Sequence, residues 1–191
     1  MIRRFFLPVL LALAAFGASA QTLTDPQIVT LKAAINAETN AEFVDYRQQG
    51  AVGAMTDWLN QAASPAYYVK RTALSRHEIL TGTSDQGTTF TWAGAAYITR
   101  SQGERDAFRE MFNSTGTVNP SLPSIVAAFA DIFSGAGGLS NRTHIGNMSR
   151  RTATRVEKLF AVGAGTQIGP SVLVFEGTLN PSDVIKAINL P

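Results

Sequence analysis

The sequence has no cysteine and only two histidines among its 191 residues, so several kinds of site lack their usual side chains. Without cysteine the chain can form no disulfide, thiolate nucleophile or cysteine-ligated zinc site. His77 and His144 lack the H-x-x-x-H spacing of a helical zinc site, so a metal would need distant carboxylates. We therefore expect no metal or other cofactor, and we expect both histidines at the surface or capping helices.

Two glycine-containing motifs come close to catalytic signatures but differ from them in spacing. GAGTQIG, residues 163–169, reads G-x-G-x-x-x-G and follows an expected helix, whereas a dinucleotide-binding loop has G-x-G-x-x-G after a strand. GTSDQG, residues 82–87, is wider than the G-x-S-x-G turn that presents a serine nucleophile, and a polar loop explains it better. The sequence thus predicts a non-enzymatic protein without a small-molecule substrate. A hydrolase that uses Ser84 or His144 is the remaining enzymatic alternative.

Positive charge has little excess over the whole chain but is concentrated at two places. The formal net charge of +2 comes from Arg3 and Arg4, while residues 141–191 carry six Lys/Arg against three Asp/Glu. We expect one long helix over 141–162, with an apolar face toward the core and a basic face opposite. The candidate interaction residues there are Arg142, Arg150, Arg151, Arg155 and Lys158. This face is either a solvated surface or a contact with an acidic protein or nucleic acid, and without interleaved aromatics it predicts no base-specific reading.

The first twenty residues, MIRRFFLPVLLALAAFGASA, have the form of a secretory leader. A basic start precedes an apolar run and a small-residue A-x-A ending, and the run is shorter than a membrane span. Residues 1–20 are therefore expected to be a leader cleaved after Ala20. The alternatives are a retained N-terminal helix, buried in an assembly, and a misassigned start codon.

Residues 21–191 read as one domain built mainly from short helices. Thr24, Ser75 and Ser101 begin helices in capping patterns, and the apolar residues that follow recur at helical spacing. A strand is expected in AYYVKRT (66–72) and another near the C-terminus in SVLVFEG (171–177). A last helix begins at Asn180 and should turn Val184, Ile185 and Ile188 inward. The expected fold is a compact, mainly α domain with a small β element, a short strand or hairpin near the C-terminus, and a glycine-rich hinge at 135–138.

Two blocks of the sequence resemble a known family. HEILTGTSDQGTTFTWAGAAYITRSQGERDAFREMF with the following NPSLPSIVAAFADIFSG, and ATRVEKLFAVGAGTQIGPSVLVFEGTLNPSDV, are similar to small structural proteins encoded among the virion genes of tailed bacteriophages and prophages. The likeness covers most of residues 22–190. It implies a component of the particle and transfers no catalytic residues, whereas the apolar leader departs from the family pattern.

Two functions from different classes follow from these observations. The first is a non-enzymatic head–tail connector or neck subunit, assembled in the host cytoplasm, that forms a homo-oligomeric ring and contacts portal or tail proteins, with non-specific contact to packaged DNA. Closed symmetry would let one surface bind the same partner repeatedly. The alternative is a small α-rich binding protein, exported by its leader to the periplasm or the medium, with a pocket for its ligand.

Overall fold

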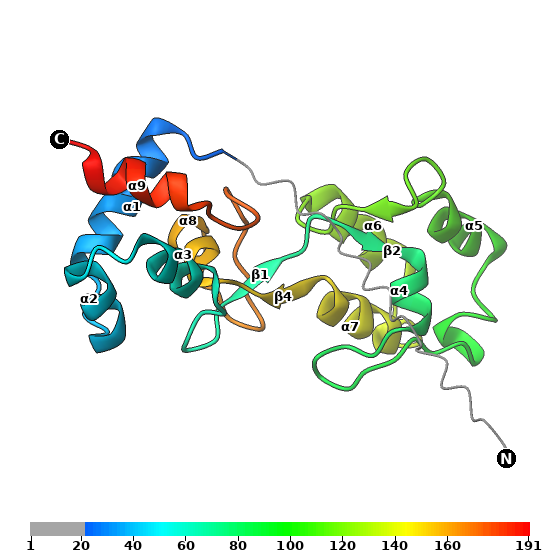
Figure 1. Cartoon of the computed structure of the whole chain (residues 1–191). Helices are drawn as coiled ribbons and strands as arrows, with labels where there is room; N and C mark the ends of the chain where they lie inside the picture. Colours follow the sequence, from blue (N-terminus) through cyan, green and yellow to red (C-terminus); the bar gives the residue numbers. More distant parts are fainter. Residues whose placement is uncertain (1–21) are drawn as a thin grey trace, which may run out of the picture.

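The computed structural model describes residues 22–191, which form two helical lobes joined by a pair of short strands (Figure 1). About half of these residues are helical, and the strands pair only in two short antiparallel ladders. The expected mainly α fold with a small β element is therefore confirmed. The predicted leader, residues 1–20, lies outside the described residues. Within residues 22–191, no helix has the length and apolar character needed to span a bilayer.

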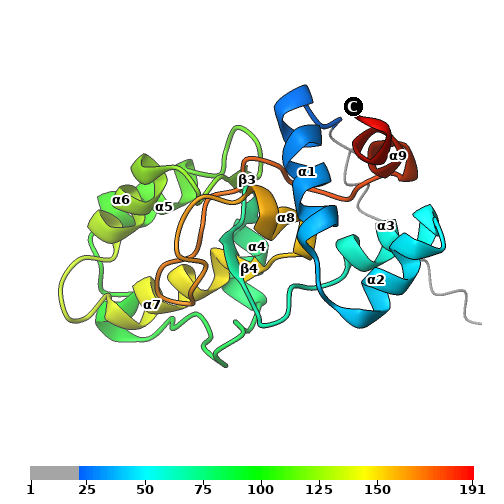
Figure 2. The ribbon, with the colours of Figure 1, turned by 90° about the vertical axis from the view of Figure 1, so that its left-hand side faces the viewer.

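The first lobe combines the two ends of the described chain. It contains the helices α1 (Asp25–Ala37), α2 (Ala41–Gln48), α3 (Val52–Asn60), α8 (Arg155–Phe160) and α9 (Pro181–Asn189). Figures 1 and 2 show α9, in red, lying against α1, in blue. The apolar residues of α1 that recur every three or four positions, Ile28, Leu31 and Ile35, are buried in this core together with Phe43 and Trp58.

Helix α9 turns fewer apolar side chains inward than its sequence predicts. Val184 and Ala187 are fully buried against α1 and α3, but Ile185 is 45% exposed and Ile188 is 43% exposed. The prediction that Ile185 and Ile188 face the core is therefore wrong. The reason is that α9 packs along one narrow i, i+3 stripe, which leaves the neighbouring apolar positions on the solvent side.

The second lobe consists of the middle of the chain. It contains β2 (Leu74–Ser75), α4 (Arg76–Thr81), a 3-10 turn η1 (Gly94–Ala96), α5 (Gln102–Glu110), β3 (Thr117–Val118), α6 (Pro123–Ile132) and α7 (Leu139–Met148). The capping boxes predicted at Ser75 and Ser101 are both present, with Glu78 and Glu104 as their partners. The core is aromatic, and Phe108 lies at its centre.

A buried asparagine holds the loop before η1 against α7. Asn141 is fully buried; its Oδ1 accepts a hydrogen bond from Thr91 N at 2.7 Å, and its Nδ2 donates to Thr91 O and Ala96 O at 2.9 and 3.0 Å. One side chain therefore satisfies three buried backbone groups, two at Thr91 in the loop and one at Ala96 in η1.

Replacing Asn141 by alanine should lower the free energy of unfolding by about 2 kcal/mol, because three polar backbone groups lose their partner in a buried site. Urea titration followed by circular dichroism measures this change. Asn147→Ala on the same helix is the matched control, since Asn147 makes only a 3.4 Å contact with Thr88 Oγ1. Equal losses in the two variants would contradict the assignment.

The connection between the lobes is a ladder of β1 (Tyr68–Lys70) and β4 (Arg150–Thr152), in which Val69 is opposite Arg151. The glycine-rich segment 135–138 lies elsewhere, between α6 and α7, and both of these helices pack in the second lobe. The segment expected to be a hinge is therefore inside one lobe. The strands, and not the glycines, join the two cores.

Candidate functional site

The long basic helix predicted over 141–162 does not form. Helix α7 ends at Met148, β4 follows, and α8 begins at Arg155. Helix α8 begins at Arg155 because Thr154 and Glu157 form a capping box. In it the Thr154 hydroxyl accepts a hydrogen bond from Glu157 N at 3.2 Å. The prediction of one helix with a single basic face is therefore wrong, and its cations lie on separate elements.

Each of the five candidate cations lies against another group of the protein. Arg150 pairs with Asp85 at 3.1 Å and stacks over Tyr68, while Arg142 donates to Phe133 O at 2.6 Å. The guanidinium carbon of Arg155 lies 3.8 Å from the centre of the Trp58 ring. Lys158 Nζ lies 5.7 Å from the ring centre of Tyr67, and Arg151 is half-buried in the cluster described next. These residues thus do not form one continuous surface for a phosphate backbone.

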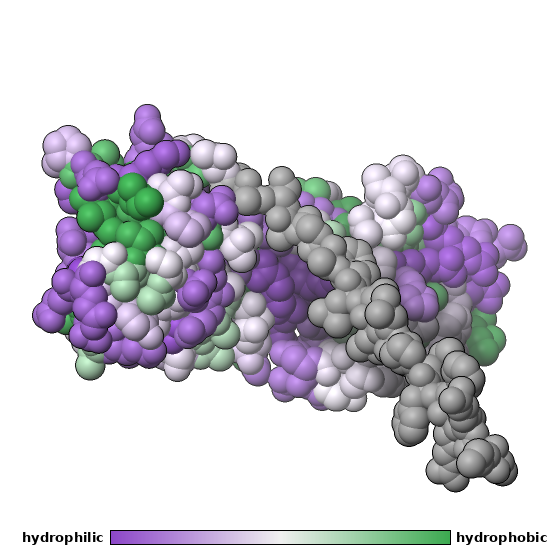
Figure 3. All heavy atoms as spheres, in the orientation of Figure 1, coloured by the Kyte–Doolittle hydropathy of each residue, from purple (hydrophilic) through white to green (hydrophobic). Residues whose placement is uncertain are grey.

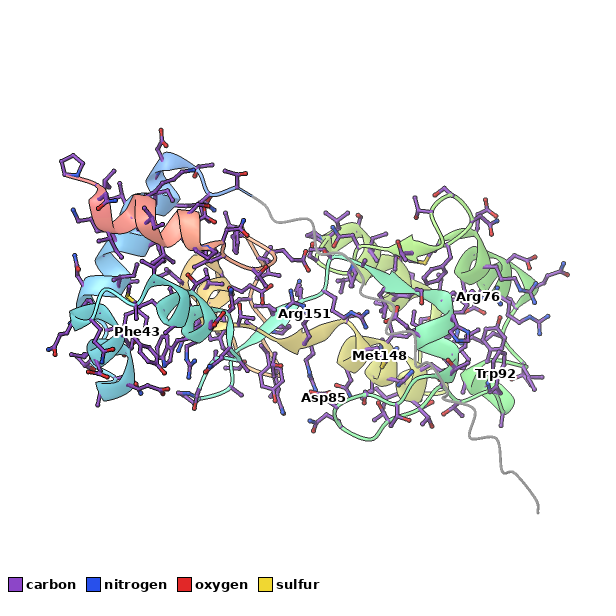
Figure 4. All side chains as sticks on the ribbon, in the orientation of Figure 1. Phe43, Arg76, Asp85, Trp92, Met148 and Arg151 are labelled. Carbon is purple, nitrogen blue, oxygen red and sulfur yellow. The ribbon has the colours of Figure 1, made fainter. Side chains whose placement is uncertain are left out.

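A cluster of one arginine and two glutamates occupies the junction of the lobes, where Figure 4 labels Arg151. Arg151 donates two hydrogen bonds of 2.7 Å to the carboxylate of Glu157 and lies 3.1 Å from Glu176. Glu157 also accepts from Thr154 N at 3.0 Å and Gly177 N at 3.2 Å. One buried carboxylate thereby ties together β4, the start of α8 and the segment before α9.

The charges in this cluster stabilise one another. Burial by itself raises the pKa of the Glu157 carboxyl. The hydrogen bonds from Arg151, Thr154 N and Gly177 N and the positive charge of Arg151 outweigh burial, so the pKa of Glu157 lies below the ordinary value of 4.5. The hydrogen bond to Glu157 raises the pKa of the Arg151 guanidinium. Both groups therefore stay ionised at neutral pH, and the cluster is structural. Sequence reasoning missed Glu157, although T-x-x-E at 154–157 is a recognisable capping signal.

The loop of residues 163–170, shown in orange in Figure 2, is fixed to the strand ladder. Tyr68 N donates to Gly165 O at 2.8 Å, and Arg150 donates to Gln167 O at 2.6 Å. Gly165 has a φ of +65°, and a Cβ added there would lie 2.0 Å from the Tyr67 ring. The positive φ and the close approach of Tyr67 therefore explain why residue 165, within GAGTQIG, is a glycine. The following SVLVFEG does not form the predicted strand. Its pairing is limited to two isolated bridges, which Ser171 and Val172 make.

This loop presents an apolar side chain beside an apolar groove. Ile168 is 99% exposed at the rim of a cavity of about 440 Å³ between α6, α7 and the loop. Val126, Phe129 and Ile145 line it with apolar side chains, and Lys70 and Arg142 are also among its lining residues. Ile168 therefore adds an exposed apolar side chain to the apolar lining of this groove.

A second hollow lies in the first lobe. Its volume is about 600 Å³, and it is lined by Phe43 and Trp58 together with Glu38, Arg155 and Lys158. The volume is within the range of small-molecule sites, and the lining offers both aromatic and charged groups. Sequence reasoning did not place these residues together, because they come from α2, α3, α8 and the turn after α1.

The residues of the hydrolase alternative serve the packing of the second lobe. His144 is fully buried, with Nε2 2.8 Å from Ile79 O and Nδ1 3.2 Å from Thr88 Oγ1. A surface position for His144 is therefore wrong, whereas its contact with Ile79 O, in the last turn of α4, agrees with the alternative of a capping residue. His77 is exposed, as predicted. Ser84 bonds Thr88 across the expected polar loop. Among residues 22–191, no three histidine, aspartate or glutamate side chains gather where they could hold a metal ion.

Comparisons with family models, curated proteins and solved structures found no match. The functional argument for this protein therefore depends on its own residues and geometry, together with the sequence resemblance described above.

Proposed function

We propose that the chain is a non-enzymatic structural subunit of a tailed-bacteriophage particle. Its most specific form is a head–tail connector subunit that assembles in the host cytoplasm, binds copies of itself and contacts portal or tail proteins. The observation that carries the proposal is the anchored loop 163–170, with Ile168 fully exposed beside an apolar groove. The resemblance of two long sequence blocks to virion proteins supports the particle as the setting.

On this proposal the subunit binds other proteins, and not DNA, through its exposed apolar side chains. Arg150, Arg151 and Arg155, which the sequence made candidates for contact with an acidic protein or nucleic acid, donate hydrogen bonds within the described chain. Exposed apolar side chains are the more available surface, since Val162, Ile168 and Val174 are each more than half exposed in one segment. Apolar burial between subunits does not require a nucleic acid partner.

Deleting the gene from its phage or prophage should give heads and tails that fail to join, as seen by electron microscopy of induced lysates. Supplying the wild-type gene in trans should restore joined particles, and mass spectrometry of purified particles should find the chain in several copies per particle. Joined, infectious particles without the protein would overturn the connector assignment. Its absence from wild-type particles would overturn the virion assignment altogether.

The hollow in the first lobe favours the second candidate function, an exported small-molecule-binding protein. Phe43 and Trp58 form its buried wall, and Glu38, Arg155 and Lys158 offer charged groups there. On this proposal the mature protein lacks residues 1–20 and is a monomer. Intact mass and native mass of the protein from its host distinguish the two functions, because the connector subunit is multimeric.

A further inference from the structure

We propose that the groove between α6, α7 and the loop of residues 163–170 binds a small amphiphile, a molecule with an apolar chain and a single carboxylate. The carboxylate lies on Lys70, and the chain lies along the apolar lining. This site is separate from the hollow in the first lobe. The inference goes beyond the proposed function, because it concerns a free small ligand and the isolated protein.

Two helices and the loop form the walls of the groove. Val126 and Phe129, three positions apart, line it from α6, and Ile145 and Gly146 line it from α7. The loop forms the third side, where Ile168 is 99% exposed. A Cβ added to Gly146 would meet no atom within 4 Å, so the space over this part of α7 is open. With a volume of about 440 Å³ and apolar walls, the groove has the size and lining of a small-molecule site.

The charged residues that line the groove are both cations. Lys70 and Arg142 are among its lining residues, and within residues 22–191 no aspartate or glutamate lines it. The hollow in the first lobe differs, because Glu38 lies there together with its cations. An apolar site that carries positive charge and no negative charge attracts an anionic ligand and repels a cationic one.

Lys70 is the cation of the strand ladder that is left for a ligand. Figure 3 shows hydrophilic surface in the recess between the lobes, where Figure 1 places β1 and β4. The cations of these strands and of the residue after β1 are Lys70, Arg71, Arg150 and Arg151. Each of the three arginines forms an ion pair with a carboxylate. Lys70 Nζ forms neither an ion pair nor a hydrogen bond with any group of residues 22–191.

The second cation, Arg142, lies at the other end of α7. Lys70 is near the C-terminal end of this helix, since the next residue, Arg71, donates its backbone N–H to Ser149 O at 2.9 Å. Arg142 is near the start of α7, and its Nη1 already donates to Phe133 O at 2.6 Å. We therefore assign the carboxylate to Lys70. The apolar chain then runs along α7 from its C-terminal end toward Arg142.

Isothermal titration calorimetry of the full-length protein with decanoate, below its micelle concentration, tests the site. Decanoate should bind as one molecule per chain, roughly tenfold or more tightly than decanol or decyltrimethylammonium, which carry a similar chain without the negative charge. Lys70→Gln should weaken decanoate binding roughly tenfold and leave decanol binding unchanged. Added salt should weaken decanoate binding to the wild type more than to this variant, because salt screens the charge of Lys70.

Three further variants locate the ligand. Gly146→Leu fills the open space over α7 and should abolish decanoate binding, while circular dichroism should show a folded protein, because leucine is a better helix former than glycine. Val126→Asp, at a position 46% exposed, puts a negative charge in the groove and should weaken decanoate binding more than decanol binding. Lys158→Gln is the matched control in the first-lobe hollow and should bind decanoate as the wild type does.

Several outcomes would overturn the inference. They are no binding of decanoate by the wild type, equal affinity for the three probes, and full affinity in both folded groove variants. Loss of affinity in Lys158→Gln, with Lys70→Gln unchanged, would place the ligand in the first-lobe hollow and also overturn the inference. Decanoate binding by a protein that is absent from particles leaves the inference standing and removes the virion function. Particles that contain a protein unable to bind decanoate would show the reverse.

Discussion

Replacing Glu157 by alanine should lower the free energy of unfolding by about 2 to 4 kcal/mol, because the variant loses two charge-assisted hydrogen bonds to a buried carboxylate and leaves the partly buried Arg151 with one carboxylate partner instead of two. The Glu157 side chain is 3% exposed and that of Arg151 is 33% exposed, so Arg151 keeps some water and its contact with Glu176. The variant also loses the capping box of α8 and the partner of Gly177 N. Urea unfolding at neutral pH measures the loss. Asp57→Asn, at an exposed position, is the control and should change stability by less than about 0.5 kcal/mol.

The charge of Glu157 should appear in the pH dependence of stability. Its pKa is lowered in the folded protein, so the carboxylate stabilises the fold above the ordinary value of 4.5, and this contribution is lost as pH falls below 4.5 toward the folded pKa. Glu157→Gln removes that titration while keeping the shape of the side chain. The stability difference between wild type and this variant should therefore shrink on acidification below pH 4.5. A difference that is constant with pH would contradict the ion-pair assignment.

Replacing Phe108 by alanine should cost about 3 to 5 kcal/mol, the usual range for removing a buried phenylalanine ring. Phe108 is fully buried, and its ring centre lies 5.4 Å from that of Phe133 and 5.5 Å from that of Phe112. Phe90, Tyr97 and Phe129 complete the surrounding rings, so the cavity left by alanine cannot close without moving several elements. Phe108→Leu, which keeps more of the volume, should lose less than half as much.

The two tryptophans report on the two cores separately, since Trp58 is in the first lobe and Trp92 is in the second. In a Trp58→Phe background, the fluorescence of Trp92 should show Phe108→Ala unfolding at clearly lower urea. In a Trp92→Phe background, the transition of Trp58 should move much less. Equal shifts of both transitions would instead indicate one cooperative unit across the strand ladder.

The sequence by itself determined where most helices begin and which faces enter a core. Hydroxyl and carboxyl residues three positions apart marked the starts of α4 and α5, and apolar spacing marked the buried faces of α1 and α5. These features are local: a capping box involves four consecutive residues, and a helical face repeats within about two turns. The mainly α class with a small β element followed from the sum of such signals.

Tertiary structure decided the remaining features, because they depend on partners far away in sequence. Residues 150–152 form a strand instead of the middle of a helix because Tyr68–Lys70 pairs with them, and Glu157 is buried because Arg151 lies beside it. Whether Ile185 points inward depends on how α9 is rotated against α1 and α3, and periodicity does not contain that angle. The division into two cores and the groove beside Ile168 likewise arise only when distant segments pack together.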